Sequence, residues 1–239
     1  MIDNIERVAV IPGPWREGDR GVVQERGPDP GELGARFQRA AVAAGATRPC
    51  EGVFQDLAAR YGEPHRWHHT LTHIDHCLVW LDWFCGSAER PEEVELALWF
   101  HDAVYSLAGG GNEHRSARLA REQLGSLGIG GASIDRIARH IEATEKHAAP
   151  GGDSALVSDL DLAILGASRG EFDLFEGRIR REYAHVPDLI YRPARSRVLQ
   201  GFLFRPEIYR VPAIRAELEA PARANLERRT LELREGGSC

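Results

Sequence analysis

Hydrophobic residues recur at three- and four-residue intervals along most of the chain, which is the period of an amphipathic α-helix. Between residues 69 and 84, for example, Leu71, Ile74, Leu78 and Leu81 form a single stripe. No stretch alternates hydrophobic and polar residues for a useful strand length, and no β-hairpin signal occurs. The pattern predicts helices over residues 32–44, 50–61, 69–84, 91–105, 112–127, 133–147, 155–165, 171–185, 195–204 and 212–233.

Capping residues mark several of these helix ends. Pro91 stands in the first turn of its helix beside acidic residues, which favours a helix start. Ser133 is the expected N-cap of the helix that follows it, and Ser168 with Glu171 matches a capping box. Pro221 predicts a kink in the last helix. The helix that begins at Pro91 becomes almost wholly apolar, so we expect it to be central and buried.

The first 31 residues differ from the rest, because they combine four prolines with many charges and glycines and lack a sustained apolar period. We expect a loosely ordered N-terminal extension over residues 1–31. Residues 32–239 are predicted to form one all-α domain of about eight to ten helices, at the upper end of the usual single-domain size. With 239 residues the chain buries enough surface to fold without disulfides.

Composition and charge exclude several classes of protein. Hydrophobic residues make up 43% of the chain and charged residues 28%, as in an ordinary globular protein. No run of 18 apolar residues predicts a membrane span, and the start MIDNIERVAVIPGPWREGD lacks the features of a secretory signal. The net charge of −6 argues against bulk binding to nucleic acid or to an anionic membrane. The four cysteines form no C-x-x-C pair, which disfavours a thiolate zinc site and favours a reducing cytoplasm.

Histidine and lysine are distributed unevenly. None of the ten histidines precedes His65, nine lie between His65 and His147, and the last is His185. All but one of the 30 basic residues are arginine, and the exception, Lys146, lies in no glycine-rich phosphate loop, which excludes a Walker-A site.

Two histidine-containing patches carry candidate chemistry. In the segment WHHTLTHI, His69 and His73 are four residues apart and are predicted to share one face of a helix. His101 and Asp102 end the apolar run of the next predicted helix, residues 91–105. An adjacent histidine and aspartate are costly to bury unless both are satisfied, and a metal ion satisfies both together.

A third patch, SDLDLAIL, places Asp159 and Asp161 in another apolar helical run. Imidazoles and carboxylates are the usual ligands of Zn, Fe, Mn or Co, and a set of two histidines and two aspartates leaves open positions, as in a catalytic site. Each patch alone has an ordinary interpretation as a hydrogen-bonded core pair or a helix cap. Together, in this order and against apolar helices, they predict a metal site.

The order His, His-Asp, Asp on an all-helical chain resembles the HD superfamily of metal-dependent phosphohydrolases, and more narrowly a bacterial family of predicted metal-dependent HD phosphohydrolases. The matching elements are Arg66 to His69, His73-Ile74, Trp99 to Tyr105, Asn112 to Ala117, Thr144 to His147, Asp159 to Gly166 and Ile179 to Tyr183. The likeness runs from about Glu32 to Leu233. It departs at His68, where Tyr is usual, and at Ser158, where Leu is usual; neither is a presumed ligand.

The resemblance implies a ligand set for one or two divalent ions from among Mn, Fe, Co, Mg, Ni and Zn. The set consists of His73, His101, Asp102 and Asp161. A further likeness to cyclic-nucleotide phosphodiesterases implies His69 as the general acid. Asp159 stays an alternative to Asp161.

Further residues receive candidate roles around this set. If two metals bind, Asp102 would bridge them, and His140 and His147, seven apart on one predicted helical face, would complete the second position. His147 is otherwise a candidate phosphate ligand, and Glu113 a candidate for positioning water or holding His69. Candidate phosphate contacts, because arginine offers a planar fork of donors, are Arg66, Arg178, Arg180 and Arg197.

We therefore expect hydrolysis of a small phosphate ester, a nucleotide or related metabolite. A bound metal lowers the pKa of water from ~15.7 toward ~7, and His69 would protonate the leaving oxygen. Two alternatives belong to other classes: an HD-fold di-iron oxygenase that uses His140 and His147 as added ligands, and a non-enzymatic ligand sensor that keeps the fold. The pattern is compatible with a homo-oligomer and selects neither the substrate nor the metal.

Overall fold

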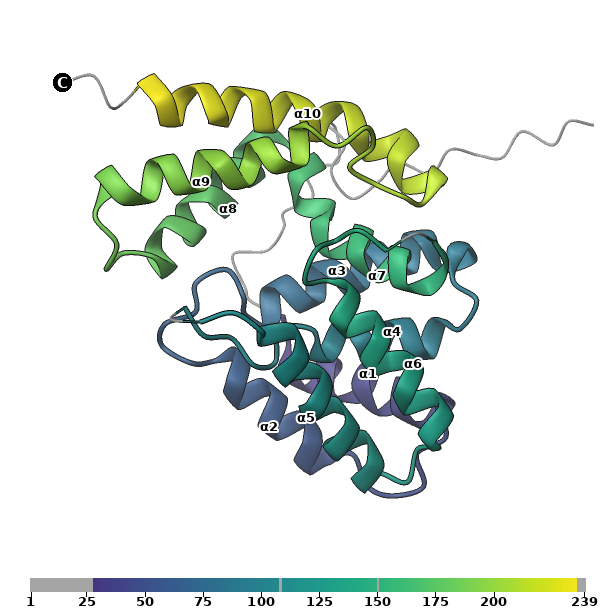
Figure 1. The fold of residues 1–239 in the computed structure, drawn as a ribbon. Coiled ribbons are helices and arrows are strands. Elements are labelled where there is room, and N and C mark those ends of the chain that lie inside the picture. The colour runs from purple at the N-terminus through teal and green to yellow at the C-terminus, as the bar shows by residue number, and fades with distance from the viewer. Residues whose placement is uncertain (1–27, 108, 150, 236–239) are drawn as a thin grey trace, which may run out of the picture.

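The computed structural model describes residues 28–107, 109–149 and 151–235, and these residues form helices and no strand (Figure 1), which confirms the all-α prediction. The elements are α1 (Pro30–Ala43), α2 (Glu51–Tyr61), α3 (Leu71–Phe84), η1 (Cys85–Ser87), α4 (Pro91–Phe100), α5 (Asn112–Ser126), α6 (Gly131–Ala143), α7 (Gly152–Asp161), η2 (Leu162–Gly166), α8 (Arg169–Glu182), α9 (Asp188–Leu203) and α10 (Pro212–Glu235). The expected N-terminal extension lies outside the described residues except for 28–31, of which the last two begin α1.

Some predicted helix ends are confirmed and others are wrong. The Ser168 hydroxyl accepts the Glu171 amide and donates to the Glu171 carboxylate, so the capping box is present. Ser133 is not an N-cap, because α6 begins at Gly131. Helix α9 starts seven residues before the predicted start, since Pro193 removes one backbone hydrogen bond without ending the helix. Pro221 likewise lies inside α10, which runs on to Glu235.

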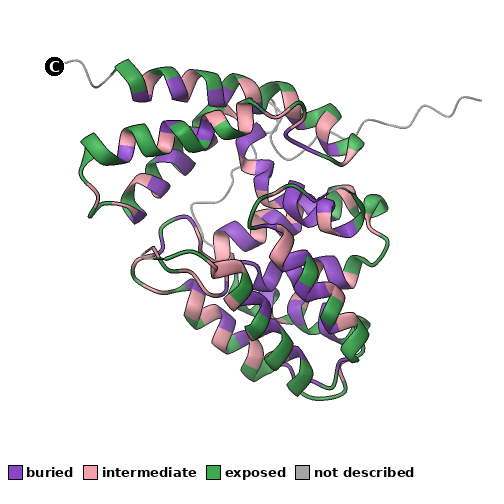
Figure 2. Cartoon of the chain, viewed as in Figure 1, coloured by how far each residue is buried: buried purple, intermediate pink, exposed green. Residues whose placement is uncertain are grey.

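Helix α4 lies at the centre of the part of the molecule formed by α1 to α7, as predicted (Figure 1, Figure 2). From Leu96 to Phe100 every side chain is fully buried. The Trp99 ring meets the rings of Phe37 and Phe54 edge to face, with centroids 5.7 and 6.0 Å apart. The helix ends at Phe100 rather than at the predicted residue 105, so the residues that follow enter a turn at the edge of this core.

Helices α8, α9 and α10 form a second layer above α3 and α7 (Figure 1). The 3₁₀ turn η2 joins the two layers: the Asn225 amide of α10 donates to the carbonyls of Leu165 and Ala167. These bonds fix the end of η2 against α10. None of the helices in the described ranges is long and apolar enough to cross a membrane.

Candidate metal centre

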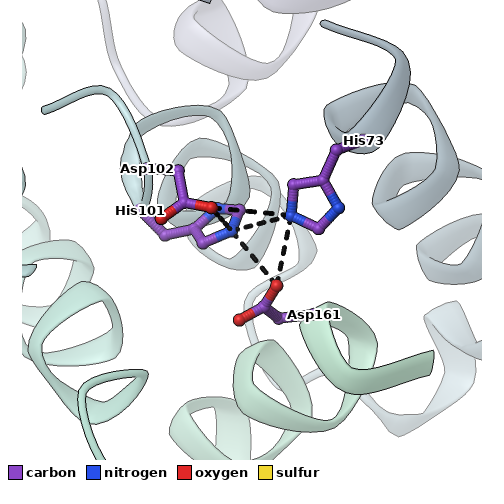
Figure 3. Close-up of side chains that lie close together, drawn as sticks. All are labelled: His73, His101, Asp102 and Asp161. Atoms are coloured by element: carbon purple, nitrogen blue, oxygen red, sulfur yellow. Dashed lines mark hydrogen bonds and ion pairs between the residues drawn. The ribbon is translucent and has the colours of Figure 1, made fainter. Parts of the chain in front are cut away.

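Four side chains from three separate helical segments meet at one point (Figure 3). His73 comes from the first turn of α3, His101 and Asp102 follow the last residue of α4, and Asp161 ends α7. Each contributes one nitrogen or oxygen atom, and these four atoms all lie within 4.8 Å of one another. This buried His/His/Asp/Asp group could therefore hold a metal ion.

The closest approaches in this group join imidazole nitrogens to carboxylate oxygens. Nε2 of His73 lies 3.1 Å from Oδ1 of Asp161, and Nε2 of His101 lies 3.3 Å from the same oxygen and 3.2 Å from Oδ2 of Asp102. The two Nε2 atoms are 3.1 Å apart. Both imidazoles are buried, whereas the side chains of Asp102 and Asp161 are 15% and 16% exposed, so the group opens to solvent on its carboxylate side.

Hydrogen bonding prepares His101 as a ligand. Its Nδ1 lies 2.8 Å from the carbonyl oxygen of Leu98, one turn earlier. Because a carbonyl only accepts, Nδ1 carries the hydrogen and the neutral imidazole keeps its lone pair on Nε2, the atom that faces the group. The donor set thus fits a divalent cation: lone pairs of two imidazoles and two carboxylates converge, and an outer hydrogen bond orients one of the rings.

The electrostatics of the group favour a positive charge at its centre. Burial by itself lowers the pKa of His101, but the carboxylates of Asp102 and Asp161 more than offset this effect and raise it well above the usual range. Burial raises the pKa of Asp161, and the facing imidazoles of His101, His147 and His73 lower it further than burial raises it. A proton held between imidazole and carboxylates is the charge that a metal ion replaces on binding.

The structure separates Asp159 from Asp161, which the sequence left as alternatives. Oδ2 of Asp159 accepts the backbone N–H groups of Arg210 and Val211 at 2.7 and 2.6 Å, so this carboxylate holds the start of α10. Asp161, two residues later, is the aspartate of the third patch that reaches the four-residue group.

His69 lies beside the group but not on α3. That helix begins at Leu71, so the prediction that His69 and His73 share one helical face is wrong. The reason is a tertiary one: a single carboxylate oxygen of Glu182 accepts the backbone N–H groups of Trp67, His68 and His69, which holds these residues in a turn. Nε2 of His69 still lies 3.9 Å from Oδ2 of Asp102.

Glu182 is the residue of this site to which the sequence assigned no role. Its second oxygen, Oε2, lies 2.8 Å from Nδ1 of His69 and accepts the Tyr105 hydroxyl at 3.0 Å, while the Tyr105 ring stacks on the His69 ring at 4.1 Å. Burial raises the pKa of Glu182, but the bonds from His69 and from the backbone lower it to about 2. In the sequence, the signal for this role is an acidic residue three positions after Ile179, which places Glu182 on the buried face of α8.

Glu113, the carboxylate predicted to position water or hold His69, lies half-buried in the first turn of α5 and outside the four-residue group. The carboxylate that holds His69 is Glu182. The structure thus gives the holding role to an acid 113 residues away in sequence.

Two of the predicted phosphate-binding arginines bind the protein itself. Arg66 is buried and donates to the carbonyls of His69, Asp102 and Ala103, so it ties the turn before α3 to the turn after α4. Arg180 caps the end of α8 by donating to the carbonyl of Tyr183, and it also pairs with Asp188. Both guanidinium groups have structural acceptors.

His140 and His147 do not share a helical face, because α6 ends at Ala143. His140 Nδ1 lies 2.8 Å from the Ser154 hydroxyl instead. His147 has a positive φ of 44°, and its carbonyl accepts a bond from Arg205 at 2.7 Å. Its Nε2 lies 2.7 Å from Oδ2 of Asp161, so His147 reaches the open side of the four-residue group.

The comparisons with known proteins do not assign the chain to a family, so its class is described from its fold and its site. No protein-family model, no curated protein and no solved structure matches the chain. It is an all-helical domain with a buried His/His/Asp/Asp cluster, which is compatible with the HD type, and no family match confirms that type.

Proposed function

We propose that the chain is a metal-dependent phosphohydrolase that acts on a small phosphate ester, a nucleotide or related metabolite. The observation that carries this proposal is the convergence of His73, His101, Asp102 and Asp161 on one point that is open on the carboxylate side. A divalent ion held there would supply a bound water of lowered pKa and would stabilise charge on phosphoryl oxygens.

His69 is the proposed proton donor to the leaving oxygen. Glu182 engages Nδ1 of His69 and the Tyr105 ring stacks on its face, so the imidazole is held with Nε2 toward Asp102. A general acid must be fixed within hydrogen-bond reach of the reacting oxygen, and these contacts fix it beside the proposed metal ligands. On the other flank, His147 contacts Asp161 and is proposed to meet the phosphate.

The test compares two aspartates on one helix. Purified protein is assayed with Mn, Co, Mg, Ni, Zn and Fe against nucleotides and generic phosphate esters. We expect His101→Ala and Asp161→Asn to lower both turnover and metal content by more than about a hundredfold. Replacing a residue that only hydrogen-bonds to a metal ligand typically costs about ten- to a hundredfold. Asp159→Asn is the matched control, since an amide oxygen still accepts the two backbone N–H groups. Equal losses in Asp159→Asn and Asp161→Asn, or unchanged activity in His101→Ala, would contradict the proposal.

Metal analysis of protein purified without added metal separates the alternatives. Two tightly held iron atoms with oxygen consumption would favour a di-iron oxygenase. A metal-bound protein that is inert toward every phosphate ester would favour a ligand sensor. The structure weakens the case for a di-iron oxygenase, because His140, one of its two added ligands, contacts Ser154 and lies outside the four-residue group.

A further inference from the structure

Arg178 lies on the face of α8 that packs against the turn before α3. Phe175, three residues earlier, places its ring centroid 4.6 Å from that of His68. Glu182, four residues later, accepts the backbone N–H of His68. Because residues three and four apart share a helix face, Arg178 stands between these two contacts with the site.

The Arg178 guanidinium has no acceptor among the described residues, and its side chain is half-buried. Arg180 and Arg195, by contrast, have carbonyl or carboxylate partners in the same layer. A half-buried guanidinium offers five donors and is costly to leave without an acceptor. Arg178 is therefore placed to donate hydrogen bonds to an acceptor that a ligand supplies.

A small pocket adjoins the four-residue group on the side of α3 and η2. It shares His73 and Asp161 with that group, and His68 and His76 also line it. Of the described residues that line it, Asp161 alone is acidic. Burial lowers the pKa of His76 to about 4, and the charges of His73 and Arg178 lower it as well. Arg178 does not line the pocket itself, but it shares its helix face with Phe175, whose ring packs against His68 of the lining. Arg178 therefore approaches the pocket from the His68 side.

We propose that Arg178 binds an anionic oxygen of the substrate, a phosphate oxygen of the ester, at the edge of the His68–His76 pocket. The inference rests on the proposed function and names the residue that makes this site selective for anions. Arginine suits the role because its planar fork matches the spacing of two phosphate oxygens.

The test titrates metal-loaded protein with inorganic phosphate in a calorimeter. We expect Arg178→Gln to weaken phosphate binding about ten- to a hundredfold, the loss that follows from removing a charge-assisted hydrogen bond, with metal content unchanged. Arg181→Gln is the matched control: Arg181 lies on the same helix, exposed, over the Trp67 ring at 5.0 Å. With an ester that is hydrolysed, Arg178→Gln should raise KM more than it lowers kcat, and Arg178→Lys should recover part of the loss.

The outcomes separate this inference from the function on which it rests. Equal phosphate affinity in wild type, Arg178→Gln and Arg181→Gln overturns the role of Arg178. A wild-type chain that takes up metal but binds no phosphate overturns it as well. A wild-type chain that takes up no metal contradicts the proposed function, and the role of Arg178 falls with it.

Discussion

Glu182 shows how one buried carboxylate organises the site. It accepts five bonds: three backbone N–H groups on one oxygen, and the His69 imidazole and the Tyr105 hydroxyl on the other. An ionised carboxylate has about four acceptor sites and is costly to bury without donors. Because both of its oxygens accept hydrogen bonds, Glu182 holds the turn before α3 and also orients His69, the proposed proton donor.

Replacing Glu182 should alter the pH dependence of stability. Its folded pKa of about 2 lies below its ordinary value of 4.5, so the unfolded chain binds more protons in this window. The stabilisation is complete above pH 4.5 and is lost as the pH falls toward 2. We expect Glu182→Gln to lower the free energy of unfolding by about 1–3 kcal/mol at neutral pH, and the gap from wild type to shrink with acid.

Denaturant unfolding of both proteins between pH 7 and pH 2 measures this gap. Glu227→Gln, at an exposed position of α10, is the control and should follow the wild-type curve. A gap between wild type and Glu182→Gln that stays constant across the acid range would show that the carboxylate charge does not stabilise the fold.

The corner formed by η2 decides how the layer of α8 to α10 sits over the metal centre. Gly166, at the end of η2, lies directly against α10: a Cβ there would stand 2.8 Å from the Leu218 Cβ and 3.0 Å from the Leu218 carbonyl oxygen. Since backbone cannot move aside as a flexible side chain can, the approach of η2 to α10 requires glycine. Asp161 lies at the start of this corner, so the metal centre depends on the same packing.

Two glycine substitutions with opposite expected effects on stability test this packing. Gly166→Ala should lower the free energy of unfolding by about 1–3 kcal/mol, because the added methyl forces η2 away from Leu218. Gly177→Ala, in α8, meets open space and should raise stability by about 0.5–1 kcal/mol, since alanine favours the helix. Thermal or denaturant unfolding compares the two. If Gly166→Ala proves as stable as wild type, the close approach of η2 and α10 is refuted.

The four-residue group links three helical segments that are far apart in sequence, so metal binding should stabilise the whole domain. An ion that binds the folded chain alone adds about 2.7 kcal/mol at a free concentration of 100 Kd. For a domain of this size each kcal/mol raises Tm by roughly 2–4 °C. We therefore expect a rise of roughly 5–10 °C when a suitable ion is added to metal-free protein.

Scanning calorimetry with Mn, Co, Ni, Zn, Fe and Mg measures this rise, and a chelator should reverse it. His101→Ala is the control, because it removes a buried ligand and should show no shift at the same concentration. A rise of equal size in His101→Ala would place the binding site elsewhere on the chain.

Local sequence is enough to predict that the chain is helical, that α4 is central and buried, and that three patches carry the proposed ligands. These features depend on residues close together in the chain: apolar positions three and four apart, caps at helix ends, and charged groups within apolar runs. The same local logic failed where a distant group overrides it. The periodicity predicts His69 on a helix, whereas its backbone N–H donates to Glu182, 113 residues away.

Contacts between distant segments determine which polar residues act together. Asp159 and Asp161 stand in similar local sequence, and the backbone of residues 210 and 211 takes up the first and leaves the second to the metal centre. Arg66 and Arg180 find carbonyl acceptors, whereas Arg178 has none among the described residues. The physical reason is that a buried polar group is assigned by the partner that reaches it in space, and periodicity along the chain carries no information about that partner.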